Sequence, residues 1–166
     1  ADFGDVPAAD RYAVAAFVAG LHDQPAITDF YLARLARAGG PDDLIDALKI
    51  EIDRGKTKGP YGAFPAGPLS AENTAGLIYR VAADRNSILG AKLAAALEHT
   101  HMLVFRPRDA APRAMQALLD AGWSTNAIVT LSQLVAFLSF QVRSVVGLRV
   151  LGASLGRRAP AAAKAS

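Results

Sequence analysis

The sequence predicts an all-α domain, and three observations support this prediction. Apolar residues recur at intervals of three and four in most segments of the chain. Alternation with a period of two, which is typical of strands, is rare. Glycines and prolines gather between the periodic segments. Because 52% of the 166 residues are hydrophobic, the chain can build a sizeable core, and we expect one helical domain over residues 1–155.

Three helices are expected in the first part of the chain. Residues 10–20 form an alanine-rich run, and residues 26–38 carry apolar side chains at helical spacing before two glycines end the helix. Pro41 suits the start of a third helix. The apolar stripe of that helix consists of Leu44, Ile45, Leu48 and Ile52. The segment at about 55–76 is rich in glycine and proline, which predicts a long loop with a functional or interaction role.

Two helices with one apolar face each are expected next, at residues 84–102 and 111–121. The inward-facing residues are Leu89, Leu93 and Leu97 in the first helix and Met115, Leu118 and Leu119 in the second. A break is expected between them at Pro107.

The most apolar segment covers residues 126–151, with Ser124 or Thr125 as its N-terminal cap. Two arginines and two glutamines interrupt it, and such residues are costly in lipid. We therefore interpret it as a helix of a soluble protein, buried almost all round, and not as a membrane span. Residues 156–166 have nothing to bury and are expected to form a loose tail.

The composition excludes several classes of function. The chain has no cysteine, which excludes disulfides, thiolate metal sites and cysteine nucleophiles. Its net charge of +3 is small and the basic residues are scattered, so we expect no nucleic-acid partner. No G-x-G-x-x-G, Walker, H-E-x-x-H or G-x-S-x-G motif occurs, which leaves nucleotide-binding, zinc-protease and serine-hydrolase functions unsupported. We expect no metal and no cofactor.

One group of candidate functional residues surrounds the end of the fourth expected helix, at residues 98–109. His99 and His101 point about 200° apart on a helix, so they cannot share one ion, although Glu98 with His101 leaves a weaker metal alternative. We interpret both histidines as helix-end residues near backbone carbonyls. Arg106 belongs to a small basic patch. This patch is either a solvated loop in which Asp109 caps the next helix, which we favour, or a site for an anionic ligand.

Polar residues also mark the last helix. Gln133 and Gln141 lie two turns apart on one face, which indicates either a helix–helix contact in an oligomer, the option we favour, or the lining of a small polar pocket. Arg143 points away from this stripe. We interpret it as a buried structural arginine with a carboxylate or carbonyl partner, or as an anion-binding residue.

The sequence from residue 119 reads Leu-Asp-Ala-Gly-Trp-Ser, and Ile128, Arg143 and a Gly-Leu pair at 147–148 follow along the last helix. This pattern resembles the alkylhydroperoxidase D-like, carboxymuconolactone decarboxylase (CMD) superfamily, and in particular a peroxidase-related CMD-domain subfamily. Residues 12–31 are similar to the half that carries the active centre of that family, and the loop at 60–70 is similar to that of the subfamily. The matched parts cover about half of the chain.

The resemblance implies an all-helical fold that assembles as a dimer, trimer or hexamer. Active members carry a glutamate, a Cys-x-x-Cys pair and a histidine, and the two thiols perform redox chemistry. Here Tyr12 stands at the glutamate position, Gln24 and Ile27 at the cysteine positions and Tyr31 at the histidine position. Cysteine-dependent peroxidase activity is therefore not expected.

We expect a CMD-like protein without a thiol centre that binds or transforms a small organic molecule in a helical pocket. His22 and Tyr31 are the candidate catalytic residues, and Tyr12, Gln24 and Ile27 complete the predicted pocket. The alternative is a non-catalytic oligomeric assembly or partner-binding module that uses the long loop and the last helix as contact surfaces. The sequence leaves open whether the chain is an enzyme. We expect a cytoplasmic homo-oligomer with no membrane partner.

Overall fold

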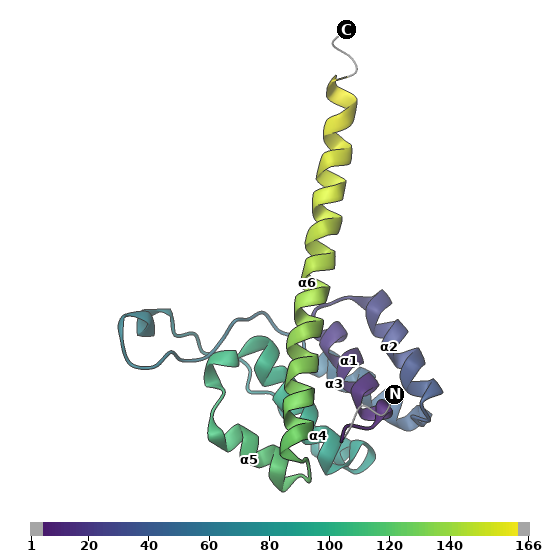
Figure 1. Ribbon diagram of the computed structural model, residues 1–166, viewed down its shortest axis with the longest axis vertical. Coiled ribbons are helices and arrows are strands. Elements are labelled where there is room, and N and C mark those ends of the chain that lie inside the picture. The colour runs from purple at the N-terminus through teal and green to yellow at the C-terminus, as the bar shows by residue number, and fades with distance from the viewer. Residues whose placement is uncertain (1–4, 163–166) are drawn as a thin grey trace.

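The computed structural model describes residues 5–162, with side chains as far as Leu155. Over this range the chain folds into six α-helices and two short 3-10 helices, without a strand (Figure 1). The helices are α1 (Ala8–Leu21), α2 (Pro25–Arg37), α3 (Asp42–Gly55), η1 (Pro68–Glu72), α4 (Ala83–Phe105), η2 (Pro107–Asp109), α5 (Pro112–Asp120) and α6 (Thr125–Ala162). The prediction of an all-α fold is confirmed.

Helix α1 lies at the centre of the domain and contacts α2, α3, α4 and α6. Every residue from Ala13 to Leu21 is buried. Small side chains let the neighbouring helices approach closely, and a Cβ atom on Gly20 would lie 2.3 Å from a side-chain carbon of Ile52 on α3. The alanine-rich composition that predicts this helix therefore also permits its dense packing.

Helices α3 and α4 present the apolar faces that the sequence predicts. Their buried residues include Ile45, Leu48 and Ile52 on α3 and Leu89, Leu93 and Leu97 on α4. Helix α4 is kinked at Gly90, whose φ of 75° and ψ of 150° are accessible to glycine and strained for other residues. It ends at Phe105, three residues after the predicted end at residue 102, and the predicted break at Pro107 follows.

The short helix α5 differs from its prediction. Leu118 is buried, but Met115 and Leu119 are each 41% exposed, so the prediction that all three face inward is wrong. Helix α5 contacts only α4 and α6 among the α-helices. A nine-residue helix at the edge of the domain buries a single row of side chains.

The long loop between α3 and α4 covers residues 56–82, so it extends beyond the predicted end at residue 76. It leaves the domain as a narrow excursion with η1 at its tip (Figure 1). An isolated bridge pairs Gly62 with Thr74 across the two arms of the excursion. The loop therefore has a fixed base and an exposed tip.

Asp109 fastens this base to the domain. Its carboxylate accepts hydrogen bonds from the backbone N–H of Ala63 at 3.0 Å and from the guanidinium of Arg106 at 2.8 Å. These contacts lower the pKa of Asp109, the backbone hydrogen bond being the larger cause. The prediction that Asp109 caps the next helix is wrong, since α5 follows Ala111 without a side-chain cap.

Helix α6 packs one face on α1 and α4 and then projects beyond the domain (Figure 1). Its buried residues are Ala127, Ile128, Leu131, Val135, Leu138 and Val142. No side chain described after Val142 is buried, so the prediction of a helix buried almost all round is wrong. The reason is length, because α6 has 38 residues and its neighbour α1 has 14.

The two ends of α6 are also defined. The cap predicted at Ser124 or Thr125 is Ser124, whose Oγ accepts a hydrogen bond from the N–H of Ala127 at 3.1 Å. The helix continues to Ala162, so the tail predicted to be loose from residue 156 is helical as far as Ala162. Residues 163–166 of that predicted tail lie outside the described residues.

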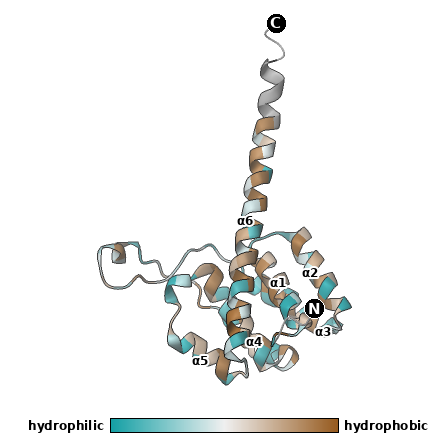
Figure 2. Ribbon diagram, in the orientation of Figure 1, coloured by the Kyte–Doolittle hydropathy of each residue, from teal (hydrophilic) through white to brown (hydrophobic). Residues whose placement is uncertain are grey.

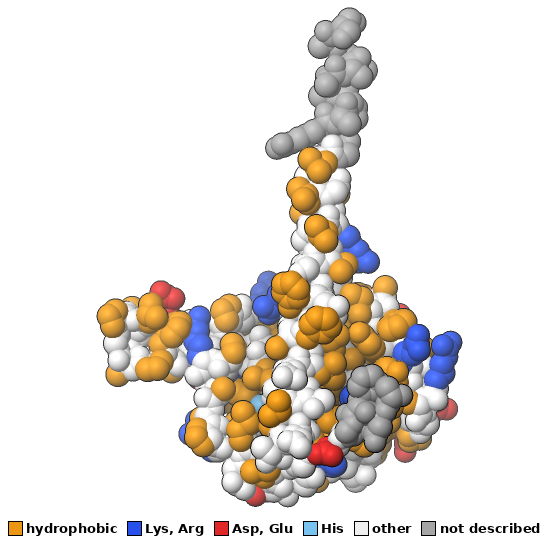
Figure 3. Space-filling view, viewed as in Figure 1, with side chains coloured by type: hydrophobic (Ala, Val, Ile, Leu, Met, Phe, Trp, Pro, Cys, Tyr) orange, Lys and Arg blue, Asp and Glu red, His pale blue; other side chains and the backbone are white. Residues whose placement is uncertain are grey.

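Hydrophobic residues follow α6 out of the domain (Figure 2) and remain visible on its surface (Figure 3). The segment Thr125–Leu155 is long and apolar enough to cross a membrane by length and composition alone, and 17% of its most apolar window is buried. A single helix of this kind is weak evidence for a membrane span.

Candidate functional site

The five residues predicted to form a pocket are spread along the hairpin of α1 and α2. Tyr12 on α1 and His22, which directly follows α1, are separated by about 15 Å along the helix axis, at 1.5 Å per residue. Gln24 precedes α2 and donates a hydrogen bond to the carbonyl of the residue before it at 2.9 Å. Ile27 and Tyr31 are half-buried on α2. Among these five, only Gln24 lines one of the described cavities, so the predicted pocket is not gathered at one point, and a catalytic role for His22 and Tyr31 stays a prediction.

His22 follows the last residue of α1 and is half-buried near Arg143 of α6. Burial lowers the pKa of His22 to about 4, and the positive charge of Arg143 acts in the same direction. Its Nε2 atom is buried without a hydrogen-bond partner among the described residues. Arg143 itself is exposed, so the interpretation of a buried, paired arginine is wrong.

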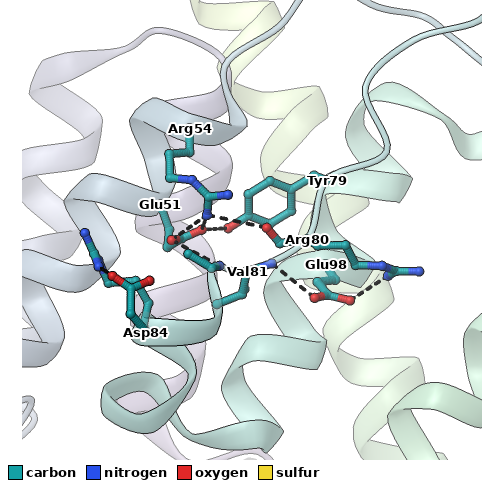
Figure 4. A network of polar contacts seen from close by, with 9 residues as sticks. Glu51, Arg54, Tyr79, Arg80, Val81, Asp84 and Glu98 are labelled. Carbon is teal, nitrogen blue, oxygen red and sulfur yellow. Dashed lines mark hydrogen bonds and ion pairs between the residues drawn. The ribbon is translucent and has the colours of Figure 1, made fainter.

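A fully buried carboxylate, Glu51, is the centre of a polar network between α3 and the end of the long loop (Figure 4). The guanidinium of Arg54 donates to both carboxylate oxygens, at 2.7 and 2.6 Å. The Tyr79 hydroxyl donates to Oε2 at 2.6 Å. A buried charge is tolerated only when donors surround it, so this network fixes the loop end onto α3.

Tyr79 joins the network to an aromatic stack in the core. Burial, followed by its hydrogen bond to Glu51, raises the pKa of Tyr79, so the hydroxyl keeps its proton. Its ring stacks on His101 with a centroid distance of 4.9 Å, and His101 also contacts Phe105 at 4.9 Å. Nε2 of His101 lies 3.0 Å from the carbonyl of Gly55, and because a carbonyl only accepts, this nitrogen carries the proton.

A cavity of about 360 Å³ opens beside this stack, between α4, η2, α5 and the end of the long loop. Its charged and polar lining consists of Tyr79, Arg80, Glu98, His99, His101, Arg106, Asp109 and Arg113. Aliphatic residues, including Ile78, Met102 and Ala117, complete the wall. The volume suits a small organic molecule.

His99 is 5% exposed and lines this cavity. Its Nε2 lies 3.0 Å from the Ser132 hydroxyl of α6, while Nδ1 is buried without a partner among the described residues. Burial lowers the pKa of His99, so its imidazole is neutral at pH 7. His99 and His101 contact different elements, α6 and α3, as their spacing predicts, and the described residues hold no group of three metal-ligating side chains.

The charges around the cavity do not balance. Glu98 is held by Arg80 at 2.6 Å and by the backbone N–H of Val81 at 3.1 Å. Asp109 is bound by Arg106, as described above. Arg113 is exposed and forms no hydrogen bond or ion pair with the described residues, although its charge, after the backbone hydrogen bond from Ala63 and the contacts of Arg106, also helps to lower the pKa of Asp109. The cavity therefore has one guanidinium more than its carboxylates neutralise.

The sequence contains the signals for this site only in part. Arg106 and the two histidines are among the residues that the sequence singles out, and the structure places all three on one cavity. Glu51 was missed, although its position between Leu48 and Ile52 on an apolar face marks it as a buried carboxylate. Tyr79 gives no local signal, because it lies in an irregular segment.

Comparison with protein-family models, with curated proteins and with solved structures finds no match to this chain.

Proposed function

We propose that this protein binds a small organic anion, with a carboxylate as the best-fitting group, in the cavity between α4, η2 and α5. The observation that carries this proposal is the excess guanidinium of Arg113 beside the paired Arg106. An arginine fork matches the two oxygens of a carboxylate, and a charge-assisted pair of this kind is roughly twice as strong as a neutral hydrogen bond.

The aliphatic wall and His99 supply the other requirements of such a site. Ile78, Met102 and Ala117 offer apolar surface to the body of the ligand. A neutral imidazole can donate or accept a proton through its free Nδ1 atom, depending on the hydrogen bond to Ser132. The site thus combines an apolar wall with a buried, neutral imidazole.

The resemblance to the CMD superfamily belongs to this proposal. An all-helical chain with a cavity and no cysteine fits a relative that keeps ligand binding and has lost thiol chemistry. The supporting site lies on α4 and α5, and the α1–α2 hairpin residues His22 and Tyr31 are not part of it. We place the protein in the cytoplasm, with α6 contacting protein and not lipid.

Isothermal titration calorimetry with benzoate, glutarate and the uncharged analogue benzyl alcohol tests the proposal. Benzoate or glutarate should bind, and benzyl alcohol should bind at least ten times more weakly. Arg113→Gln should lower the affinity for the acid by about 10- to 100-fold, the range expected for a lost charge-assisted hydrogen bond.

Arg37→Gln is the matched control, because Arg37 is an exposed arginine on α2 away from the cavity. It should bind the acid as the unaltered chain does. Equal affinity for benzoate and benzyl alcohol, no binding of any acid, or an equal loss in the two arginine variants would each overturn the proposal.

The alternative function is a non-catalytic assembly or partner-binding module. The observation that favours it is the row of exposed apolar side chains on α6. The two functions are separable, because the cavity lining does not include α6.

A further inference from the structure

Five of the large apolar side chains exposed on α6 lie along one face of the helix and are called here the α6 stripe. Its large members recur every three to eight residues in the pattern of a helix-packing seam. They are Phe137, Phe140, Leu148, Leu151 and Leu155. Ser144 lies at the centre of the stripe, and at 100° per residue every large member falls within about 40° of it.

The α6 stripe faces away from the core of its own domain. Leu131, Val135 and Leu138, which are buried against α1 and α4, lie about 120–180° from Ser144 around the helix. Each large member of the stripe is at least 53% exposed. The stripe begins on the part of α6 that packs on the domain and continues onto the projection. A soluble chain rarely leaves so long an apolar row uncovered.

We propose that the α6 stripe binds the same stripe of a second copy of this chain, as an antiparallel pair of helices related by a two-fold axis at Ser144. In this register Phe140 faces Leu148 of the partner subunit, and Phe137 faces Leu151 of the partner subunit. Large side chains therefore meet large ones on both sides of the axis, and the small Ser144 lets the helices approach where they cross. Such an interface is self-complementary, as two-fold symmetry requires.

The area of this contact is sufficient for a specific dimer. If each of the five large side chains loses roughly 100 Å² of surface, the two copies together bury about 1,000 Å², the lower bound for a specific interface. The domain adds to this contact. An open apolar groove of about 950 Å³ borders the stripe, and Phe140, Ser144 and Phe105 are among its lining residues. The projecting end of each copy would lie over the domain of the other, next to this groove.

Two observations favour a second copy over a lipid bilayer as the occupant. The projection continues as a helix to Ala162, but its apolar stretch between Arg143 and the Arg-Arg pair at 157–158 is only about 20 Å long, whereas a bilayer core is about 30 Å thick. The first part of α6 cannot supply the missing length, because it is buried against α1 and α4. Arg149 interrupts the projection and lies about 140° from Ser144, off the stripe. A charge placed there is costly in lipid and harmless in a helix pair.

Size-exclusion chromatography with light scattering on the full chain tests the dimer, with Leu148→Glu and Val150→Glu as matched variants. Both residues are exposed on the projection, at 67% and 64%, but Val150 lies about 120° from Ser144, outside the stripe. We expect a dimer for the unaltered chain and for Val150→Glu, and a dissociation constant raised at least 100-fold for Leu148→Glu. A monomeric unaltered chain, or an equal effect of the two variants, would overturn the proposal.

A vesicle experiment tests whether a membrane occupies the stripe. Co-sedimentation of the unaltered chain with phosphatidylcholine vesicles, lost equally in both variants, would show that the projection binds lipid and would overturn the proposal of a second copy.

Single cysteines test the register, because the chain has none of its own. Ser144→Cys should form a disulfide-linked dimer on oxidation. Leu151→Cys should stay uncrosslinked, since in the antiparallel pair the two copies of this residue lie about 21 Å apart along the helices. Crosslinking of Leu151→Cys without crosslinking of Ser144→Cys would overturn the antiparallel arrangement. Circular dichroism of each variant shows that the helices are retained.

Discussion

The network around Glu51 and the projecting part of α6 differ in which groups they bury: the network buries a charge, and the projection exposes apolar side chains. In the network a fully buried charge is surrounded by donors, and the adjoining aromatic rings stack in the core. On α6, large apolar side chains such as Phe140 are exposed to solvent. The first region is complete within one chain, and the second is not. Stability of the monomer should therefore depend on the network, and the proposed assembly should depend on the helix.

The largest expected effect comes from removing the cation of the network. Arg54→Met leaves the fully buried carboxylate of Glu51 with Tyr79 as its remaining side-chain donor, and should lower the free energy of unfolding by about 3 kcal/mol at pH 8, the low end for a buried pair because the Arg54 side chain is 44% exposed. The free energy of unfolding is measured by urea denaturation, monitored through the fluorescence of the single tryptophan, Trp123. Lys49→Met, which removes the cation of an exposed ion pair with Asp46, should cost less than about 0.5 kcal/mol. A loss for Arg54→Met no larger than that of Lys49→Met would show that the network is not a stabilising centre.

A smaller effect is expected from acid. His22 has an ordinary pKa of 6.5 and a folded value of about 4, so between these values the unfolded chain binds a proton that the folded chain does not. Stability should therefore fall as the pH is lowered from 6.5 to 4, with His22 accounting for about 2 kcal/mol. His22→Gln should flatten this part of the curve of unfolding free energy against pH. An unchanged curve would mean that His22 titrates normally.

The smallest effect is expected on α6. At concentrations where the chain is monomeric, Leu151→Ala should change the free energy of unfolding by less than about 0.5 kcal/mol, because this side chain is already exposed. Chemical denaturation at two protein concentrations separates this effect from that on assembly. A loss above 1 kcal/mol in the monomer would show that the projection packs on its own domain and would remove the contrast between the two regions.

Local patterns predict the helices well because each pattern acts within one element. The leucines at 89, 93 and 97 face the core as their spacing requires, and glycines and prolines end the helices where expected. The predictions of burial fail where the tertiary surroundings of a helix, and not its own pattern, determine which side chains are covered. Leu119 has the same local signal as Leu118, but at the edge of the domain it stays 41% exposed, whereas Leu118 is buried. The apolar sequence of α6 likewise predicts that its side chains are buried. It does not predict whether the residues that bury them belong to the same chain.

The candidate site illustrates the same limit. Arg106, His99 and His101 are close in sequence, so their shared location is predictable from one helix and its end. The partners of the two histidines are distant in sequence: His101 contacts the carbonyl of Gly55, 46 positions away, and His99 contacts Ser132 on another helix, 33 positions away. His22 and Tyr31 are close in sequence too, yet helical rise spreads such residues along a hairpin.

The bridge between Gly62 and Thr74 has a practical consequence for handling the molecule. The arms of the loop are joined to each other, and two neighbouring residues hold the loop on the domain: Asp109 binds the base, and Arg108 donates to the carbonyl of Glu72 at the end of η1. An epitope or a fluorescent tag inserted at the tip around η1 would interrupt neither the cavity nor the α6 stripe. A protease cut at the tip would give two fragments that stay associated through α1, α3, α4 and α6.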